Sequence, residues 1–416
     1  MVGWVIYKGG TTMHSGLKSV FAATISFGAL LACSGETVQT ASNEAAAPAA
    51  TQVDWSQGAP DYRVDIDWPK PLPNKWLMQS VTGMHVDKDD NIWVLNRPDS
   101  IGGDETNAEK TPPVSECCVR PPAVMKFNKA GDLLASWGGT GYVPGWPQNE
   151  HTIFTDNEGN VWIAGSQAGD SLLKFTADGK LISDFGHRGQ KFDGPASGQK
   201  QNNQQTELLL RGVANAELDE AAGEIYVADG YLNKRVMVFD LATGAFKRGW
   251  GAYGTPLDKI GNEPTPPHNP AGPPLKEYRP SVHCVQISND NLVYVCDRGG
   301  NRVQVFTKQG EFQKEFIVAN DTLERGTAGM VSFSPDPEQR FMFLADIQNS
   351  AVWILNRQTG EVAGRFGRRG YGAGEMMLMH LAVSDSEGNV YTGEVGDAGR
   401  VQKFRPVPKG SQQASR

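Results

Sequence analysis

Short apolar strands separated by polar turns recur along most of this chain, a pattern typical of β-structure. One unit occurs six times: a turn, an apolar strand that carries a central aromatic residue, a second turn, and a strand that ends in a large apolar residue. The six central aromatic residues are Trp93, Trp162, Tyr226, Tyr294, Phe343 and Tyr391. The last two steps between them are 49 and 48 residues, and the earlier steps are longer because they contain extra loops. A repeat of this period with about four short strands predicts the blades of a β-propeller.

The repeat count predicts an all-β fold, a six-bladed β-propeller over residues 53–408. The sequence pattern of the repeat, clearest in Tyr294–Phe306, resembles the NHL repeat. The last repeat lacks an outer strand, whereas Tyr62–Trp68 alternates apolar and polar residues without a blade of its own. We expect this N-terminal strand to pair with the last blade and close the ring, which removes the open edges. A seventh blade from residues 53–75 is the alternative, although that segment is short.

The composition fits this interpretation. The 416 residues include 48 Gly and 25 Pro, more than the usual share but too few for a disordered or collagen-like chain. A net charge of −8 argues against nucleic acid as a partner, because phosphate binding needs a surplus of Lys and Arg. The body of the chain contains no long apolar run, which excludes a polytopic membrane protein. We expect a monomer.

The N-terminal segment is predicted to be a targeting signal. The apolar run Val20–Ala32 is short for a membrane span, and Leu30–Cys33 (LLAC) resembles the lipobox of bacterial lipoproteins. Residues 1–33 are therefore expected to be a signal peptide with lipidation at Cys33, and Met13 would give a more typical start. An ordinary secretory signal with a chance cysteine is the alternative.

Two further segments are predicted to lie outside the fold. Residues 34–52 are rich in Ala, Ser and Thr and are expected to form a flexible tether, and residues 409–416 a disordered tail. Ser34 after the cysteine resembles lipoproteins that are sorted to an outer membrane. We thus expect an exported protein that faces the periplasm from the outer membrane, touches that membrane only through its lipid anchor, and can form disulfides.

Three histidines occupy one position of the repeat. His151, His283 and His380 each stand 14 residues before the end of the second strand in repeats two, four and six. Alternate blades lie about 120° apart, so the three imidazoles are predicted to converge on the axis. Three nitrogens from one side leave a coordination position open, the layout of a catalytic zinc site. We therefore predict one zinc ion, with hydrogen-bonded rim histidines as the alternative; His85 is out of register and is predicted to be a strand side chain.

The chain around these histidines resembles a known enzyme family. Val227–Val236, Leu95–Arg97 and the three histidine contexts look like peptidyl-α-hydroxyglycine α-amidating lyase, over roughly residues 76–405. The resemblance implies a zinc-dependent lyase in which the three histidines hold zinc, Tyr231 is the base and Arg97 orients the substrate. Such an enzyme breaks the C–N bond of an α-hydroxylated amide and releases an amide and an aldehyde such as glyoxylate.

The repeat pattern places two of these residues independently. Arg97 and Tyr231 follow the second strands of blades one and three, which end on the histidine face. Positive charge from a metal and from Arg97 is expected to favour the phenolate of Tyr231, so that it acts as a base below its usual pKa of about 10. Ordinary blade-loop residues are the alternative interpretation.

The sequence also departs from the family. Leu381 stands where the family commonly has an Asp of a calcium site, so calcium is doubtful; Leu378 and Leu232 replace a Met and a Cys of the family. The substrate is expected to be a small molecule or peptide-derived, and it need not be a peptide. Two other functions remain open: zinc-dependent hydrolysis of a lactone or ester at the same site, and a non-catalytic NHL propeller that serves as a binding scaffold.

Four cysteines outside the leader are disulfide candidates. Cys284 and Cys296 flank a hairpin turn symmetrically and can form a cross-strand disulfide beside the second histidine, with free buried thiols as the alternative. Cys117 and Cys118 are adjacent and can form a vicinal disulfide. A structural role beside the pocket is favoured over a redox role or metal ligation.

Two long insertions are predicted on the histidine face. They are Pro98–Pro122 and Thr255–Pro280, the second with eight prolines. Loops of this length inside a compact domain are usually functional, so we expect both to wall the pocket. A rigid cover that only buttresses neighbouring blades is the alternative.

Overall fold

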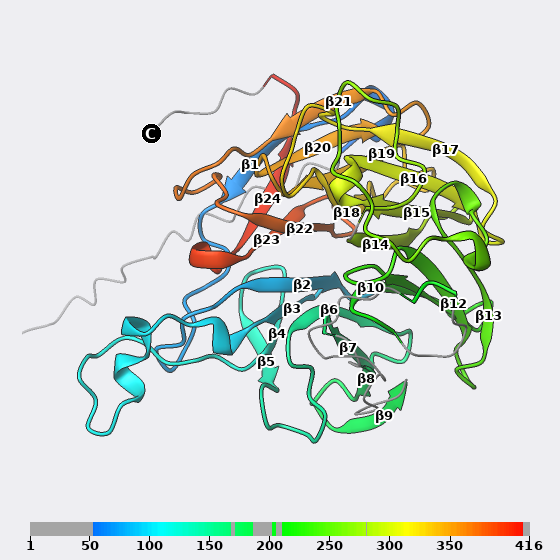
Figure 1. Ribbon diagram of the computed structural model, residues 1–416. Coiled ribbons are helices and arrows are strands. Elements are labelled where there is room, and N and C mark those ends of the chain that lie inside the picture. The colour runs from blue at the N-terminus through cyan, green and yellow to red at the C-terminus, as the bar shows by residue number, and fades with distance from the viewer. Residues whose placement is uncertain (1–52, 168–170, 186–201, 205–209, 280, 411–416) are drawn as a thin grey trace, which may run out of the picture. The chain divides into compact units, whose positions relative to one another are not determined.

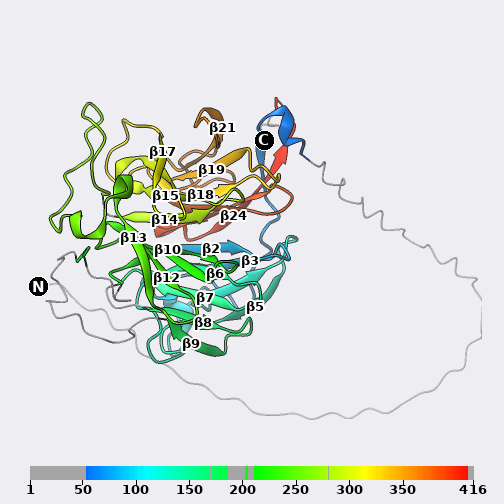
Figure 2. The ribbon, with the colours of Figure 1, turned by 90° about the vertical axis from the view of Figure 1, so that its right-hand side faces the viewer.

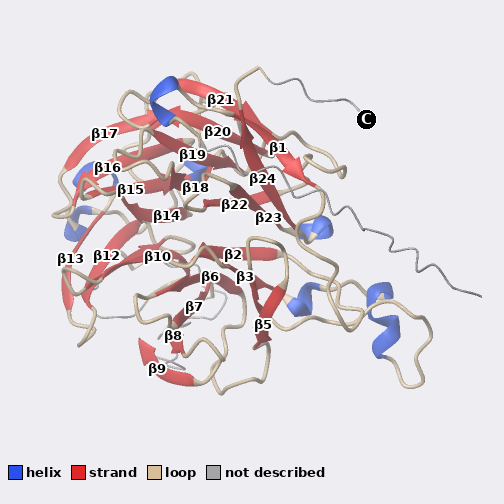
Figure 3. Cartoon of the chain, turned by 180° about the vertical axis from the view of Figure 1, so that it is seen from behind, coloured by secondary structure: helices blue, strands red, loops and turns tan. Residues whose placement is uncertain are grey.

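The computed structural model describes residues 53–167, 171–185, 202–204, 210–279 and 281–410, and the structural statements below refer to these residues. They form 24 strands in six four-stranded antiparallel sheets, arranged as the blades of a ring (Figures 1 and 3). The fold is thus the six-bladed all-β propeller that the repeats predict. The predicted signal peptide (1–33), Cys33 and the tether (34–52) lie outside the described residues.

The first three blades follow one another along the chain. Blade one consists of β2 (Val81–Val86), β3 (Ile92–Asn96), β4 (Val124–Phe127) and β5 (Leu133–Trp137). Blade two consists of β6 (Glu150–Thr155), β7 (Val161–Gly165), β8 (Leu172–Phe175) and β9 (Leu181–Phe185). Blade three consists of β10 (Val213–Asp219), β11 (Glu224–Asp229), β12 (Arg235–Asp240) and β13 (Phe246–Trp250).

The other three blades complete the ring. Blade four consists of β14 (Val282–Ile287), β15 (Leu292–Asp297), β16 (Arg302–Thr307) and β17 (Phe312–Ile317). Blade five consists of β18 (Ala328–Phe333), β19 (Phe341–Asp346), β20 (Ala351–Asn356) and β21 (Val362–Phe366). Blade six consists of β22 (Met379–Ser384), β23 (Val390–Glu394), β24 (Val401–Val407) and β1 (Asp61–Asp65).

Helical structure in the described residues is limited to seven short 3-10 turns. These are η1 (Trp55–Gln57), η2 (Pro98–Ser100), η3 (Asp104–Glu109), η4 (Ala252–Gly254), η5 (Leu257–Lys259), η6 (Arg298–Gly300) and η7 (Gly396–Ala398). None of the described helices is long and apolar enough to cross a membrane.

The N-terminal strand closes the ring, as predicted. β1 pairs antiparallel with β24, with Val64 opposite Phe404. Its buried Tyr62 stacks on Phe366 of blade five at 4.5 Å between ring centroids and donates its hydroxyl to the Gly388 carbonyl at 2.9 Å. The first and last strands of the described chain are therefore joined in one sheet, and a seventh blade is not formed.

The central aromatic residues fill the spaces between blades. Trp93 and Trp162 are almost fully buried, at 1% and 3% exposure. Their indole N–H groups donate to Asp87 and Asp156, the residues that stand six positions earlier in the preceding turn, at 3.0 and 3.2 Å. A buried ring with a satisfied polar tip anchors the turn to the interblade core, so this unit of the repeat builds the blade.

Candidate metal centre

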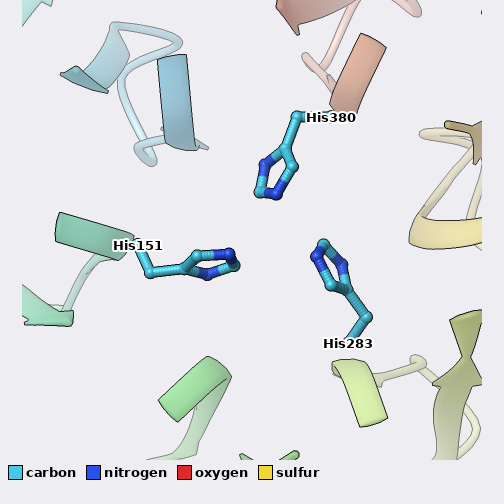
Figure 4. Close-up of side chains that lie close together, drawn as sticks. All are labelled: His151, His283 and His380. Carbon is cyan, nitrogen blue, oxygen red and sulfur yellow. The ribbon is translucent and has the colours of Figure 1, made fainter. Parts of the chain in front are cut away.

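The innermost strand of every blade has a β-bulge at its second residue. The register shift is the same in β2, β6, β10, β14, β18 and β22, and these first strands contact one another around the axis. The six bulged residues are Thr82, His151, Ala214, His283, Gly329 and His380. A bulge re-aims its side chain, and here the histidines of alternate blades point at one another (Figure 4). The small residues between them leave room for the imidazoles.

The structure brings the three predicted histidines together. The ring centroids of His151, His283 and His380 lie 4.8–5.3 Å apart. One ring nitrogen from each lies within 4.8 Å of the others, and the side chains are only 2–6% exposed. Among the described residues this is the one group of three His, Cys, Asp or Glu side chains that could hold a metal ion.

Backbone carbonyls of the next blade orient two of the imidazoles. His151 Nδ1 lies 2.7 Å from the Ala214 oxygen, and His283 Nδ1 lies 2.6 Å from the Gly329 oxygen. A carbonyl only accepts, so Nδ1 carries the proton in both rings and Nε2 keeps its lone pair for a ligand. His380 Nδ1 is buried and has no hydrogen-bond partner among the described residues.

Burial keeps the triad neutral. It lowers the pKa of His283 to about 3, with a further contribution from Arg298, and it lowers the pKa values of His151 and His380 well below the ordinary value for histidine. Neutral imidazoles are the form that binds metal ions. Two oriented imidazoles and the neutral ring of His380 together could hold one metal ion, and this donor set is compatible with zinc.

Tyr231 lies directly beside the triad. Its hydroxyl oxygen is 2.6 Å from His151 Nε2 and 3.3 Å from His283 Nε2. The residue follows β11 and is held by a hydrogen bond from its backbone N–H to the Gly212 oxygen at 3.2 Å. Gly212 has a φ of +95°, and a Cβ there would lie 2.7 Å from the Tyr231 Cβ, so glycine is required for this approach.

Two arginines flank the phenol. Arg97 donates from Nε to the Glu150 carbonyl at 2.8 Å, next to His151 in the chain. The Arg298 guanidinium carbon lies 5.9 Å from the centroid of the Tyr231 ring. Burial raises the pKa of Tyr231, and the positive charges of Arg298 and Arg97 oppose that rise. The sequence-based expectation of a lowered pKa considered charge without burial, and in the protein by itself burial prevails.

Arg298 was not among the residues predicted from sequence, although a signal for it exists. It follows the second strand of blade four directly, as Arg97 follows that of blade one. It also lines a cavity of about 510 Å³ together with Arg279, Arg325, Gly299, Glu324 and Gln348. The Arg298 Nε is buried and has no hydrogen-bond partner among the described residues. Three guanidinium groups against one carboxylate give the cavity a positive lining that suits an anion.

The four cysteines form the two disulfides that the sequence offers as candidates. Cys284 lies opposite Cys296 in the β14–β15 pair, both are fully buried, and a disulfide joins them. It fastens the strand that carries His283 to its neighbour. Cys117 and Cys118 form a vicinal disulfide in the first insertion.

The two insertions differ in placement. Residues 98–122 project from the side of blade one (Figures 1 and 3), and none of them is among the residues that line the arginine-lined cavity. The loop between β13 and β14 extends beyond the strands at one end of the ring (Figure 2) and contributes Arg279 to the arginine-lined cavity. It is also anchored to blade three, because buried Lys234 donates to Glu277 at 2.5 Å. The second insertion thus both lines a cavity and braces a neighbouring blade, the two roles that the sequence left open.

Comparisons with known proteins find relatives at low sequence identity. No family model matches the chain. The chain is 25% identical over 366 residues to NHL repeat-containing protein 3 of Mus musculus, covering 85% of this chain and 87% of that protein. It is 24% identical over 364 residues to peptidyl-glycine alpha-amidating monooxygenase B of Xenopus laevis, covering 82% of this chain and 35% of that protein, about a third of its length. A solved streptogramin B lyase aligns at 10% identity with a TM-score of 0.46, covering 83% of this chain and 98% of the other. The sequence similarities support an NHL-repeat propeller.

Proposed function

We propose that this protein is a zinc-dependent lyase that cleaves the C–N bond of an α-hydroxylated amide. One observation carries the proposal: the Tyr231 hydroxyl lies 2.6 and 3.3 Å from the Nε2 atoms of two histidines in a three-histidine group. A phenol at this distance from a metal-binding triad is placed to exchange a proton with a substrate held there. The similarity to an amidating enzyme over the propeller is consistent with this chemistry.

The residues of the site divide the reaction among them. Zinc, when bound by the histidines, would supply Lewis-acid polarisation of a substrate oxygen. Tyr231 as phenolate removes the proton of the α-hydroxyl group; the oxygen lone pair forms a C=O bond, and the C–N bond breaks. Tyr231 then returns that proton to the departing nitrogen, so an amide and an aldehyde leave in equal amounts. Arg298 and Arg97 stabilise the phenolate form, because their charges lower the pKa that burial raises.

The arginine-lined cavity suggests which substrates are bound. Arg298 contacts the Tyr231 ring and also lines the cavity with Arg279 and Arg325. Its unpartnered Nε can donate to a carboxylate of the substrate. We therefore propose an acidic substrate, such as an N-acyl-α-hydroxyglycine, for which the aldehyde product is glyoxylate.

Product analysis tests the proposed reaction. Zinc-loaded protein is incubated with an N-acyl-α-hydroxyglycine, and amide and glyoxylate are both quantified before and after removal of the metal by a chelator. The proposal requires equal amounts of the two products, loss of both on chelation, and recovery on addition of zinc. Release of a carboxylic acid in place of the amide would indicate the hydrolase alternative, and unchanged substrate would leave only a binding scaffold.

The place of action is a proposal that rests on the sequence. We infer export and lipid anchoring at Cys33 from the LLAC motif that ends at this residue. In the producing cell, Cys33→Ser should move the protein from the membrane fraction to the soluble fraction. An unchanged distribution would contradict the anchor without affecting the zinc site.

A further inference from the structure

A second ring of side chains lines the channel at the end opposite the histidines. It is formed by the residue three positions after the bulge in each inner strand, and we call it the lower ring. Its members are His85, Phe154, Glu217, Gln286, Ser332 and Val383. All six line one cavity of about 360 Å³, which residues of the first hairpin turns, such as Asn289 and Ser386, also border. A volume in this range is typical of small-molecule sites.

The lower cavity is separate from the metal centre. Directly below the triad lies a void of about 20 Å³, lined by the histidines together with Met84, Met330 and Leu381. A void of that size holds about one water molecule. Met84, Met330 and Asn215 line both spaces, so they form the narrow section between the two ends of the channel.

The polar members of the lower ring converge from different blades. His85, Glu217 and Ser332 belong to blades one, three and five, which alternate around the axis as the histidine blades do. Glu217 Oε2 accepts from Gln286 Nε2 at 3.1 Å, and that amide is also 3.3 Å from Asn215 Oδ1. The Ser332 side chain is only 9% exposed, and its hydroxyl has no hydrogen-bond partner among the described residues.

The charge of this cavity is one-sided. Its lining includes the carboxyl groups of Glu217 and Asp385 and no Lys or Arg among the described residues. Asp385 Oδ2 accepts hydrogen bonds from Asn389 Nδ2 at 2.7 Å and from the Tyr391 hydroxyl at 3.0 Å. Glu217, by contrast, has no ion pair with any described residue, whereas Asp219 two positions later pairs with a lysine at 2.6 Å. Burial raises the pKa of Glu217 to about 8, as expected for a carboxyl group without a cation beside it.

We propose that the lower cavity binds the primary ammonium group of a small organic cation, with Glu217 as its counter-ion. An ammonium group has three N–H donors, and Glu217, Ser332 and His85 offer a carboxylate, a hydroxyl and an imidazole lone pair. His85 is neutral and can accept, because burial lowers its pKa to about 4. Phe154 and Val383 line the same cavity and can cover the apolar part of the ligand.

The donor set excludes two other ligand classes. A tightly held metal ion needs several charged or imidazole ligands at once, and the described residues form no such group outside the triad. An inorganic anion would find no basic side chain in the lining to neutralise its charge. The amine proposal does not depend on the lyase proposal, because it uses none of the triad residues.

Calorimetric titration of the whole protein with n-butylamine tests the proposal, with butan-1-ol as the uncharged probe of the same length. Wild type should bind the amine with a Kd below about 10 mM and bind the alcohol at least about tenfold more weakly. Glu217→Gln keeps the shape of the side chain and should weaken amine binding at least about tenfold. Glu311→Gln removes the same charge at an exposed turn and should change nothing.

Three results would overturn the amine site: no binding by wild type up to about 10 mM, equal binding of amine and alcohol, or equal affinity in Glu217→Gln. Unfolding temperatures of both variants show whether the fold is intact. His283→Ala should still bind the amine, so loss of zinc and loss of the amine site are distinguishable. Ser332→Ala should weaken amine binding severalfold, and unchanged affinity would remove the hydroxyl from the site.

Discussion

The two ends of the channel are built from the same six strands, yet they differ in chemistry. At the upper end, bulged histidines of blades two, four and six alternate with the small residues Thr82, Ala214 and Gly329. At the lower end, the ring contains four different polar types and two apolar side chains. The upper end has threefold symmetry, which suits one small ion on the axis. The lower end is asymmetric, which suits an organic ligand with a charged and an apolar part.

A second contrast separates positions that repeat from positions that do not. Asp87, Asp156 and Asp385 each bond the aromatic residue six positions later, so this unit recurs in blades one, two and six. Tyr231 occupies a loop position after the second strand where no other blade has a tyrosine, and the position of Arg298 carries an arginine again only in blade one, as Arg97. The repeating aspartate–aromatic pairs build the fold, whereas Tyr231 and Arg298 belong to the proposed chemistry.

The largest effect is expected from His283→Ala, which removes one of the three histidines that are proposed to bind zinc. Bound zinc should fall from one equivalent to near zero, and kcat/KM for amide cleavage should fall at least about 10³-fold, because Lewis-acid catalysis is lost. Metal analysis of the purified protein and aldehyde release measure both. His85→Ala, on the inner strand of blade one, is the matched control and should keep its zinc. Loss of zinc in this variant would contradict the separation of the metal centre from the lower ring.

Removal of the Cys284–Cys296 disulfide should lower the stability of the fold without removing the metal site. The bridge closes a short loop of 12 residues in sequence separation, so the double variant Cys284→Ala/Cys296→Ala should lose about 2–3 kcal/mol of unfolding free energy. Denaturant titration gives that value. Zinc content should persist below the unfolding transition, since neither sulfur is a ligand; stability equal to wild type would show that the bridge does not constrain the unfolded chain.

A smaller loss is expected from Asp156→Ala in the repeating unit of blade two. Asp156 accepts from Trp162 Nε1 at 3.2 Å and pairs with half-buried Lys174 at 2.8 Å, and both groups would lose this partner. The free energy of unfolding should fall by about 1–3 kcal/mol, as measured by denaturant titration. Activity at low temperature should remain, whereas exposed Glu311→Ala should stay within about 0.5 kcal/mol of wild type. Loss of zinc in Asp156→Ala would contradict the separation of the two kinds of position.

The smallest effect is a change in pH dependence. Arg298 lowers the pKa that burial raises at Tyr231. The pKa of Tyr231 should therefore rise in Arg298→Gln, and a reaction that needs the phenolate should begin only at higher pH. The rising limb of the kcat/KM profile should move to higher pH in Arg298→Gln and remain closer to wild type in Arg298→Lys, which keeps the charge. A profile that does not move would remove Arg298 from the control of this proton.

The sequence predicts most of the fold for a physical reason. Each blade needs a buried aromatic residue and turns at fixed spacing, so six blades leave six copies of one pattern. The closing strand could be predicted because Tyr62–Trp68 had no other partner, and the histidines because their spacing to the second strand is constant. The Cys284–Cys296 pair could be located because its residues flank one turn symmetrically.

The lower ring and the pKa of Tyr231 could not be predicted from the repeat pattern, and Arg298 was missed. The lower ring shares no residue type, so it becomes visible only when the strands are aligned at their bulges. The pKa of Tyr231 depends on burial, which the charges in the sequence do not reveal. Arg298 could have been found by aligning the ends of the second strands, where Arg97 occupies the same position.

The most direct test of the proposed lyase is a comparison of wild type with Tyr231→Phe, which removes one oxygen atom beside the histidines. Both proteins should bind one equivalent of zinc, because the hydroxyl is not needed to hold the ion. Wild type should release glyoxylate and amide in equal amounts from an N-acyl-α-hydroxyglycine, and the variant should be slower by about 10²- to 10⁴-fold. Equal rates in the two zinc-loaded proteins would contradict the assignment of Tyr231 as the base.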